Sequence, residues 1–246
     1  MAERRLIVNA DDFGQSAGIN RGIIKSFECG VVTSASLMVR WPNAAAAAAY
    51  ARAHPQMSLG LHLDLGEWAF RNGEWAALYG VVPLDDAEAV RDEARRQFEV
   101  FRRLLGRNPT HIDSHQHVHR DEPLRSILLD MAAPLSLPLR HEDARVHYCG
   151  DFYGQSAKGY ACPEQISVNA LVEILRRLPQ GITELGCHPG EGGDVDTMYR
   201  DERAAELSAL CDERTRATLV AEGIELCSFH RLNDTPPVQG DSPTDH

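Results

Sequence analysis

The segment LIVNADDFG (residues 6–14) joins a short apolar run to two adjacent acidic residues, Asp11 and Asp12. An apolar run of this length, ended by polar residues and a glycine, predicts a buried β-strand. Neighbouring side chains on a strand point to opposite faces, so two adjacent carboxylates would normally be kept apart. If both enter one site, each makes ionisation of the other more costly unless a cation or a proton lies between them. The segment therefore indicates a functional site at the end of a buried strand.

Similar apolar runs alternate with helix-like segments along the rest of the chain. The predicted strands are residues 5–9, 34–39, 59–63, 110–114, 137–140, 183–187 and 225–228. The predicted helices are residues 17–29, 43–54, 85–105, 164–178 and 201–222. Strands that alternate with helices indicate βα units and a parallel sheet, and hence the α/β class. About seven such units suit a closed or nearly closed barrel, with a doubly wound open sheet as the alternative.

Three segments do not follow this alternation. Residues 66–83 are rich in aromatic side chains and residues 141–163 contain several glycines, and we expect both to be long loops close to a functional site. Residues 233–246 are rich in Pro, Asp and Ser, which predicts a disordered tail. The sequence therefore predicts a single domain over residues 1–232.

The composition limits the classes of function. The chain has 246 residues and a formal net charge of −11, and this acidic balance argues against a nucleic-acid partner. No apolar run approaches the roughly 20 residues that span a membrane. The apolar stretch near the N-terminus is shorter than that of a signal peptide, so we expect a cytoplasmic protein.

Acidic residues and histidines gather in four short stretches, each at the end of a predicted strand. They are NADD (9–12), GLHLD (60–64), HIDSHQHVH (111–119) and CHPG (187–190). The loops that follow the carboxyl ends of parallel strands form the active sites of α/β folds. We therefore expect residues that are far apart in the sequence to meet at one opening.

The third stretch is the strongest of these signals, because its ionisable side chains recur at every second residue. They are His111, Asp113, His115, His117 and His119. An extended strand would place all five on one face, although the strand need not stay straight to its end. Imidazole and carboxylate are the usual ligands of divalent ions, so a metal or acid–base site is favoured over a histidine-rich exposed turn.

Three further residues are ambiguous when each is considered alone. His62 lies between leucines and suits a core histidine, whereas its place at a strand end favours a site. His188, before a Pro-Gly turn, suits either an ordinary loop or the same site. Arg140 follows an apolar run and could orient a carboxylate, with a surface arginine as the alternative.

The four stretches, together with VVTSASLMV (31–39) and GRNPT (106–110), resemble the YdjC-like family, also called the ChbG/HpnK deacetylases. The resemblance extends from about residue 6 to residue 232. It implies a divergent (β/α) barrel and a metal-dependent hydrolase that removes the acetyl group from an N-acetylated sugar by attack of a metal-activated water. It also implies one divalent ion, with Zn or Mg expected, and a possible homodimer.

The resemblance assigns roles to individual residues. It places the metal ligands at Asp12, His62 and His115, and the general base at Asp11. His188 matches a histidine at the same site and is the candidate acid.

The remaining polar residues of the site are assigned less fully. Arg140 is the candidate for keeping Asp11 ionised, which completes a catalytic set of Asp11, His188 and Arg140. His117 and His119 either contact the substrate or support a ligand.

Two other classes of function stay open at this point. One is another barrel metallohydrolase, such as a phosphoesterase. The other is a non-catalytic protein that binds a sugar or a metal. The second carboxylate, Asp11, argues against simple binding, which would not require it.

Overall fold

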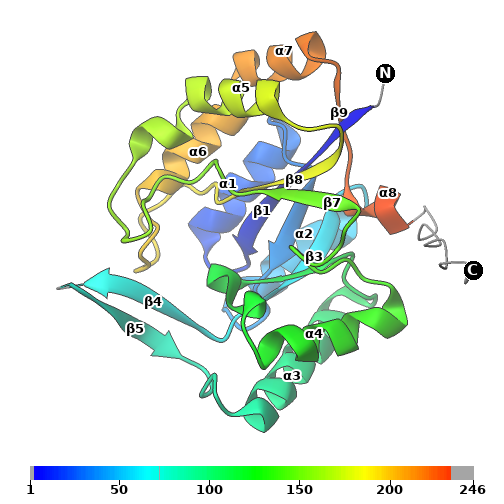
Figure 1. Ribbon diagram of the computed structural model, residues 1–246, viewed down its shortest axis with the longest axis vertical. Helices are drawn as coiled ribbons and strands as arrows, with labels where there is room; N and C mark the ends of the chain where they lie inside the picture. Colours follow the sequence, from blue (N-terminus) through cyan, green and yellow to red (C-terminus); the bar gives the residue numbers. More distant parts are fainter. Residues whose placement is uncertain (1–2, 72, 234–246) are drawn as a thin grey trace, which may run out of the picture.

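A seven-stranded parallel sheet forms the centre of the molecule, which a computed structural model describes for residues 3–71 and 73–233 (Figure 1). The strand order is β6–β3–β2–β1–β8–β7, and β9 pairs with the start of β1 on the edge opposite β8. The strands are β1 (Arg4–Phe13), β2 (Ser34–Leu37), β3 (Ser58–Leu63), β6 (Ile112–Ser114), β7 (Val146–Cys149), β8 (Gly181–Cys187) and β9 (Ile224–Leu226). Because β1 lies in the middle, the end of its long buried run is central to the whole sheet.

The edges of this sheet do not close into a full barrel within the described residues. Beyond β6, pairing is limited to one parallel bridge between Ile112 and Leu139. The prediction of a strand at residues 137–140 is therefore wrong. The opposite edge of the sheet is formed by β7, which was not predicted. The chain turns away directly after Arg140 because His141 has a left-handed backbone, with φ of 69°. The divergent barrel is confirmed as a curled, open parallel sheet in a single domain.

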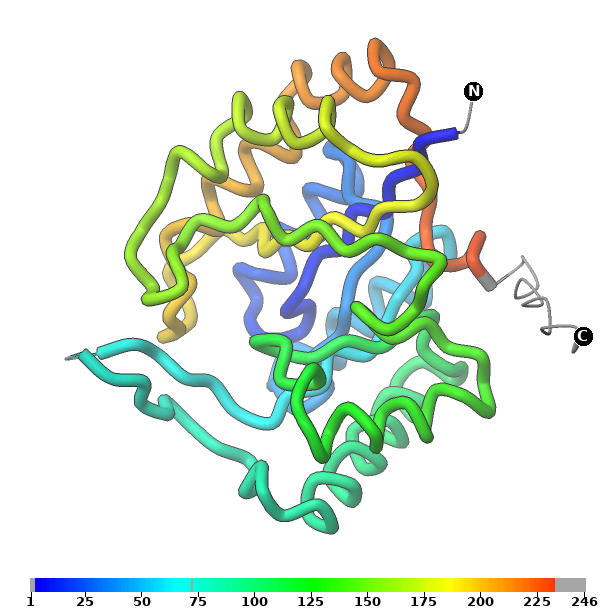
Figure 2. Tube along the Cα trace, viewed as in Figure 1, coloured from blue at the N-terminus to red at the C-terminus, as the bar shows by residue number. Residues whose placement is uncertain are grey.

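Helices cover the outside of the sheet (Figures 1 and 2). They are α1 (Ala17–Glu28), α2 (Ala44–Ala53), α3 (Ala87–Leu105), α4 (Leu124–Ala132), α5 (Val168–Arg177), α6 (Glu202–Leu210), α7 (Glu213–Ala221) and α8 (Phe229–Asn233). The main core forms where apolar side chains of β1, β2 and β3 meet those of α1, α2 and α3. Such burial is the dominant favourable contribution to folding.

The helices differ from the prediction in three places. The single helix expected over 201–222 is wrong, because the chain restarts at Asp212, whose side chain accepts the backbone N–H of Arg214 as an N-cap of α7. Helices α4 and α8 were not predicted. No helix of the described ranges is long and apolar enough to cross a membrane.

The aromatic segment 66–83 is a β-hairpin rather than a loop. Strands β4 (Gly66–Arg71) and β5 (Glu74–Gly80) pair antiparallel and project from the sheet (Figure 1). The dipeptide Asn72-Gly73 between two aromatic runs is a typical hairpin signal, and Gly73 has φ of 90°. Segment 141–163 is also less irregular than expected, because it contains β7.

The predicted tail falls almost wholly outside the described residues. Asn233, its first residue, ends α8. Residues 234–246 are not described, so their disorder stays a prediction.

Gly22 of α1 provides a test of packing beside the loop that follows β8. A Cβ added at Gly22 would lie 2.4 Å from the Cα of Gly190. We expect Gly22→Ala to lower the free energy of unfolding by about 1–3 kcal/mol through overpacking, although alanine is intrinsically the better helix residue. Denaturant unfolding measures the change. Gly80→Ala is the control, because a Cβ there meets nothing within 4 Å. Equal denaturant midpoints for the two variants would show that Gly22 is not closely packed against Gly190.

Candidate active site

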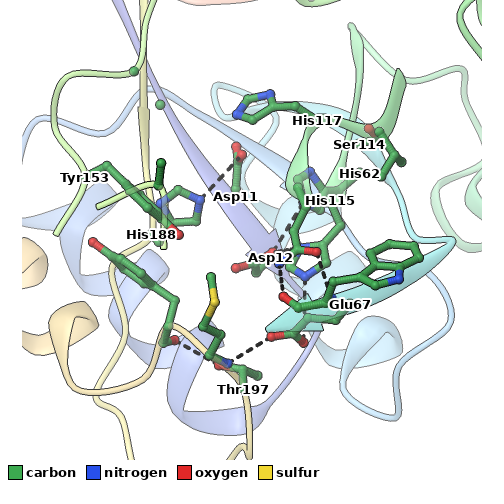
Figure 3. Close-up of a pocket in the computed structure, with 18 of the residues that line it drawn as sticks. Asp11, Asp12, His62, Glu67, Ser114, His115, His117, Tyr153, His188 and Thr197 are labelled. Carbon is green, nitrogen blue, oxygen red and sulfur yellow. Dashed lines mark hydrogen bonds and ion pairs between the residues drawn. The ribbon is translucent and has the colours of Figure 1, made fainter. Parts of the chain in front are cut away.

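An irregularity at the end of β1 directs both acids into one pocket. The register between β1 and β2 shifts between Ala10 and Phe13, and Asp12 has a left-handed φ of 67°. A bulge of this kind re-aims a side chain, and Asp is one of the residues that tolerate the left-handed region. Figure 3 shows Asp11 and Asp12 facing the same cavity, and each is at most 2% exposed. The strict alternation of the strand is thus broken where the acids lie.

Asp12 lies between two histidines that come from neighbouring strands. Its Oδ1 is 3.3 Å from Nε2 of His62 on β3 and 3.1 Å from Nδ1 of His115, which follows β6. One ligand atom from each of the three residues lies within 4.8 Å of the others. One carboxylate and two imidazoles form a donor set suited to a divalent ion with open coordination positions.

Each of these two histidines also faces a second buried carboxylate. Nδ1 of His62 donates to Oδ1 of Asp113 at 2.7 Å, which leaves Nε2 free to face Asp12. Nε2 of His115 is buried without a hydrogen bond and lies 3.8 Å from Oε2 of Glu67. Carboxylates in this outer position commonly fix the tautomer of a metal-binding histidine. The surroundings therefore fit a bound cation.

The electrostatics of the cluster also favour positive charge. Burial lowers the pKa of His62, but the carboxylates of Asp113 and Asp11 outweigh it and raise the pKa to about 10. Burial likewise lowers the pKa of His115, and its hydrogen bond to Asp12 raises it to about 9. Without an ion, the site therefore attracts protons. A divalent cation satisfies the same carboxylates in place of those protons.

Arg203 is a partner of Asp12 that sequence reasoning missed. Its Nη2 donates to Oδ2 of Asp12 at 2.6 Å, and its side chain is almost fully buried. Arg203 lies in α6, within a charged stretch that is typical of an exposed helix, so no local signal marks it. The guanidinium lowers the pKa of Asp12 despite the opposing effect of burial.

Arg140 forms a bidentate salt bridge with Asp11. The two N–O distances are 2.7 and 2.8 Å, and the same guanidinium is 2.9 Å from Asp113 and 2.7 Å from Glu184. Burial raises the pKa of Asp11, but Arg140 outweighs it and the pKa is lowered. Asp11 is therefore ionised at neutral pH, and Arg140 lies where the sequence suggested an orienting arginine.

His188 follows β8 and lies across the cavity from the metal-ligand candidates. Its Nε2 is 3.8 Å from Oδ2 of Asp11 (Figure 3). Its backbone N–H donates to Oε2 of Glu206, whose other oxygen accepts the hydroxyl of Tyr199. Burial lowers the pKa of His188 to about 4. The ring is therefore neutral at rest, and its protonated form is a stronger acid than an ordinary imidazolium.

The alternating histidines of the third stretch do not share one face. The chain leaves the extended conformation at His115 and enters a short 3-10 turn, His115–Arg120, in which His117 has a left-handed backbone. His111 points away from the cavity, and its ring stacks on Phe229 at 3.7 Å between centroids. His119 donates from Nε2 to the carbonyl of Arg140 at 3.1 Å. His117 lines the cavity.

The cavity has a volume of about 450 Å³, and aromatic side chains line several parts of it. Trp68 and Trp75 of the hairpin form part of the wall, and Trp75 is half exposed at its rim. Tyr153 and Tyr199 stack on each other beside His188. The dimensions fall in the range of pockets for small organic ligands.

Fold and site together define an α/β half-barrel with a carboxylate–imidazole cluster at the carboxyl ends of its strands. A model of the YdjC-like protein family matches residues 5–221, and the chain belongs to this family. This result confirms the resemblance noted from the sequence.

Individual relatives match over nearly their whole length. The chain is 33% identical to a chitooligosaccharide deacetylase of Serratia marcescens, over 94% of this chain and 100% of that protein. It is 32% identical to a carbohydrate deacetylase of Geobacillus stearothermophilus, over 93% and 98% of the two chains. A crystal structure from Enterococcus faecalis V583, of a proposed cellobiose-phosphate cleavage protein, shares the fold with a TM-score of 0.75 and 24% identity, over 94% and 99% of the two chains.

Proposed function

We propose that this protein is a metal-dependent carbohydrate deacetylase, which hydrolyses the amide of an N-acetylated sugar. The observation that carries the proposal is the division between the two adjacent acids. Asp12 faces two imidazoles, whereas Asp11 is held ionised by Arg140 and stays at the cavity surface. A site that only bound metal would not need the second carboxylate. Relatives named as carbohydrate deacetylases support the same reaction.

The metal ligands in this proposal are Asp12, His62 and His115. The ion is Zn²⁺ or Mg²⁺, and the two imidazoles favour zinc. When bound, the ion supplies a Lewis acid that polarises the acetyl carbonyl and makes water a stronger acid.

Side chains of the protein then transfer the protons of the reaction. Asp11 accepts a proton from the attacking water at Oδ2, as general base. The new C–O bond forms as the amide C–N bond breaks, which gives acetate and the sugar amine. The proton that Asp11 has taken passes to Nε2 of the neutral His188 ring, 3.8 Å from Oδ2 of Asp11, and the protonated ring delivers it to the departing nitrogen. Arg140 acts as a positioning residue that keeps Asp11 charged.

The charge of the cavity favours a neutral substrate over a phosphoester. Among the described residues that line the cavity, Arg203 alone carries a fixed positive charge, and Asp12 already neutralises it. The aromatic walls suit the apolar faces of sugar rings instead. We propose N-acetylated oligosaccharides of the chitin type as the first substrates to test, because the Serratia relative is named for them.

Acetate release tests the proposed function. Metal-depleted protein is given Zn²⁺ or Mg²⁺ and then incubated with N-acetylated mono- and oligosaccharides, with phosphate esters in parallel. We expect acetate from at least one sugar, dependent on added metal. Release of phosphate instead of acetate would support the alternative function of a phosphoesterase. Metal binding without turnover on any acetylated sugar would support the non-catalytic alternative.

Glu67 is a further residue whose importance the sequence did not reveal. Its Oε2 faces His115, and its Oε1 accepts the backbone N–H of Met198 at 2.9 Å. Glu67→Gln keeps an acceptor for Met198 but removes the charge opposite His115. We expect metal affinity to fall about 10- to 100-fold, as is usual for such outer partners.

Calorimetric titration of metal-depleted protein with Zn²⁺ measures this change. Glu74→Gln is the matched control, because Glu74 is exposed on β5 of the same hairpin. Equal affinities for the two variants would show that Glu67 does not position His115.

A further inference from the structure

A second histidine cluster lies beside the cavity and shares no residue with the first. His117, His119 and His141 each offer a ring nitrogen, and these three atoms lie within 4.8 Å of one another. The ring centroids are 5.2 Å apart for His117 and His141, 5.7 Å for His119 and His141, and 5.9 Å for His117 and His119. The two rings that face Asp12, those of His62 and His115, are separated by 5.6 Å. The second cluster therefore has the spacing of the first.

Uncommon backbone conformations bring these three rings together. Gln116 and His117 have φ of 51° and 55°, and His141 has φ of 69°. Left-handed backbone at residues other than glycine is infrequent and concentrates at functional sites. These turns bring His117 and His119, which are close in sequence, against His141 from the segment after Arg140.

One ring nitrogen of the cluster makes no hydrogen bond, and others make hydrogen bonds that can be exchanged for a metal ion. Nδ1 of His117 is buried and has no hydrogen-bond partner, while its Nε2 is 3.3 Å from the hydroxyl of Tyr148. His141 is exposed, which gives an ion access from solvent. His119 uses Nε2 to donate to the carbonyl of Arg140, and its Nδ1 is 2.7 Å from Oγ of Ser114.

His119 must change its protonation pattern to bind an ion. Moving its proton from Nε2 to Nδ1 lets Oγ of Ser114 accept it, which frees the Nε2 lone pair. The carbonyl of Arg140, 3.1 Å from that nitrogen, is then free to face the ion as well. The exchange costs one hydrogen bond and needs no rearrangement of the backbone.

We propose that His117, His119 and His141 form a second metal site, which takes ions that prefer imidazole. Three imidazoles without a carboxylate suit Zn²⁺, Ni²⁺ or Cu²⁺, whereas Mg²⁺ prefers oxygen ligands. The two sites of the protein therefore differ in charge and in selectivity. This inference does not depend on the proposed deacetylase activity.

The stoichiometry of zinc binding tests the second site. Metal-depleted protein is dialysed against micromolar free Zn²⁺ and its metal content is measured. We expect two equivalents in the wild type and one in His141→Ala. His147→Ala is the matched control, because His147 is an exposed histidine of β7 outside both clusters, and it should keep two. Thermal unfolding verifies that each variant folds.

Two further measurements separate the sites. His115→Ala, which leaves the Arg203–Asp12 ion pair intact, should keep one zinc, bound by the second cluster, and His115→Ala combined with His141→Ala should keep none. Mg²⁺ should bind at no more than one equivalent. One zinc in the wild type, or two in His141→Ala, would overturn the second site whether or not the protein releases acetate.

Discussion

Asp12→Ala should abolish both metal binding at the Asp12–His62–His115 cluster and metal-dependent acetate release. Asp12 supplies the one carboxylate of the proposed ligand cluster, and its Oδ1 lies within 3.3 Å of both imidazoles. Without it, the site loses the anionic group that balances the charge of the ion, and the two imidazoles alone bind a divalent ion far more weakly. We expect activity to fall to the background rate, with no recovery on addition of micromolar metal.

The same change also leaves Arg203 buried without its carboxylate partner. Breaking a buried ion pair in this way can cost about 3–5 kcal/mol, so Asp12→Ala could unfold the protein. His115→Ala therefore serves as a second variant, because it removes a ligand and leaves the Arg203–Asp12 pair intact. Metal binding and activity should fall in both variants. A folded His115→Ala protein with wild-type metal affinity would refute the ligand set.

The positions of the site residues could be predicted because each depends on a local pattern. Short apolar runs mark the strands, and parallel pairing brings their carboxyl ends to one edge whatever the exact register. Asp11, His62 and His188 follow such runs, and the structure gathers them around one cavity. The loop containing Arg140 adds the guanidinium because it continues from the bridge at the edge of the sheet.

The partners of these residues could not be predicted, because they come from packing between distant elements. Arg203 lies 191 positions from Asp12, and its charged helix gives no sign of burial. Glu67 reaches His115 only because its segment is a hairpin docked on the turn after β6, where the side chain of Gln116 bonds to both backbone groups of Trp68. Neither contact is accompanied by a periodic residue pattern that the sequence would reveal.

The alternation rule failed at two places, and both are at the site. It would have separated Asp11 from Asp12, but a bulge and a left-handed residue bring them together. It would have put His111 and His115 on one face, but the turn beginning at His115 prevents this. In both places a tertiary constraint overrides the period-two pattern, which is expected where function requires a strained backbone.

Asp11→Asn should separate the two adjacent acids by function. Asparagine keeps the shape of the side chain but cannot accept a proton from water at neutral pH. Because loss of a general base typically costs about 10²- to 10⁴-fold, we expect kcat to fall by that amount while one equivalent of metal stays bound at Asp12. Metal content and acetate release, measured on the same sample, give the two readouts.

The surroundings of Asp11 make this substitution a clean test of its role. Arg140 keeps two carboxylate partners, Asp113 at 2.9 Å and Glu184 at 2.7 Å, so the guanidinium is not left unpaired when Asp11 loses its charge. Stability should therefore change much less than in Asp12→Ala. Wild-type turnover in a metal-loaded Asp11→Asn protein would refute the base, whereas loss of metal together with turnover would place Asp11 among the ligands. Only retention of metal with loss of turnover assigns the two neighbouring acids to two different tasks.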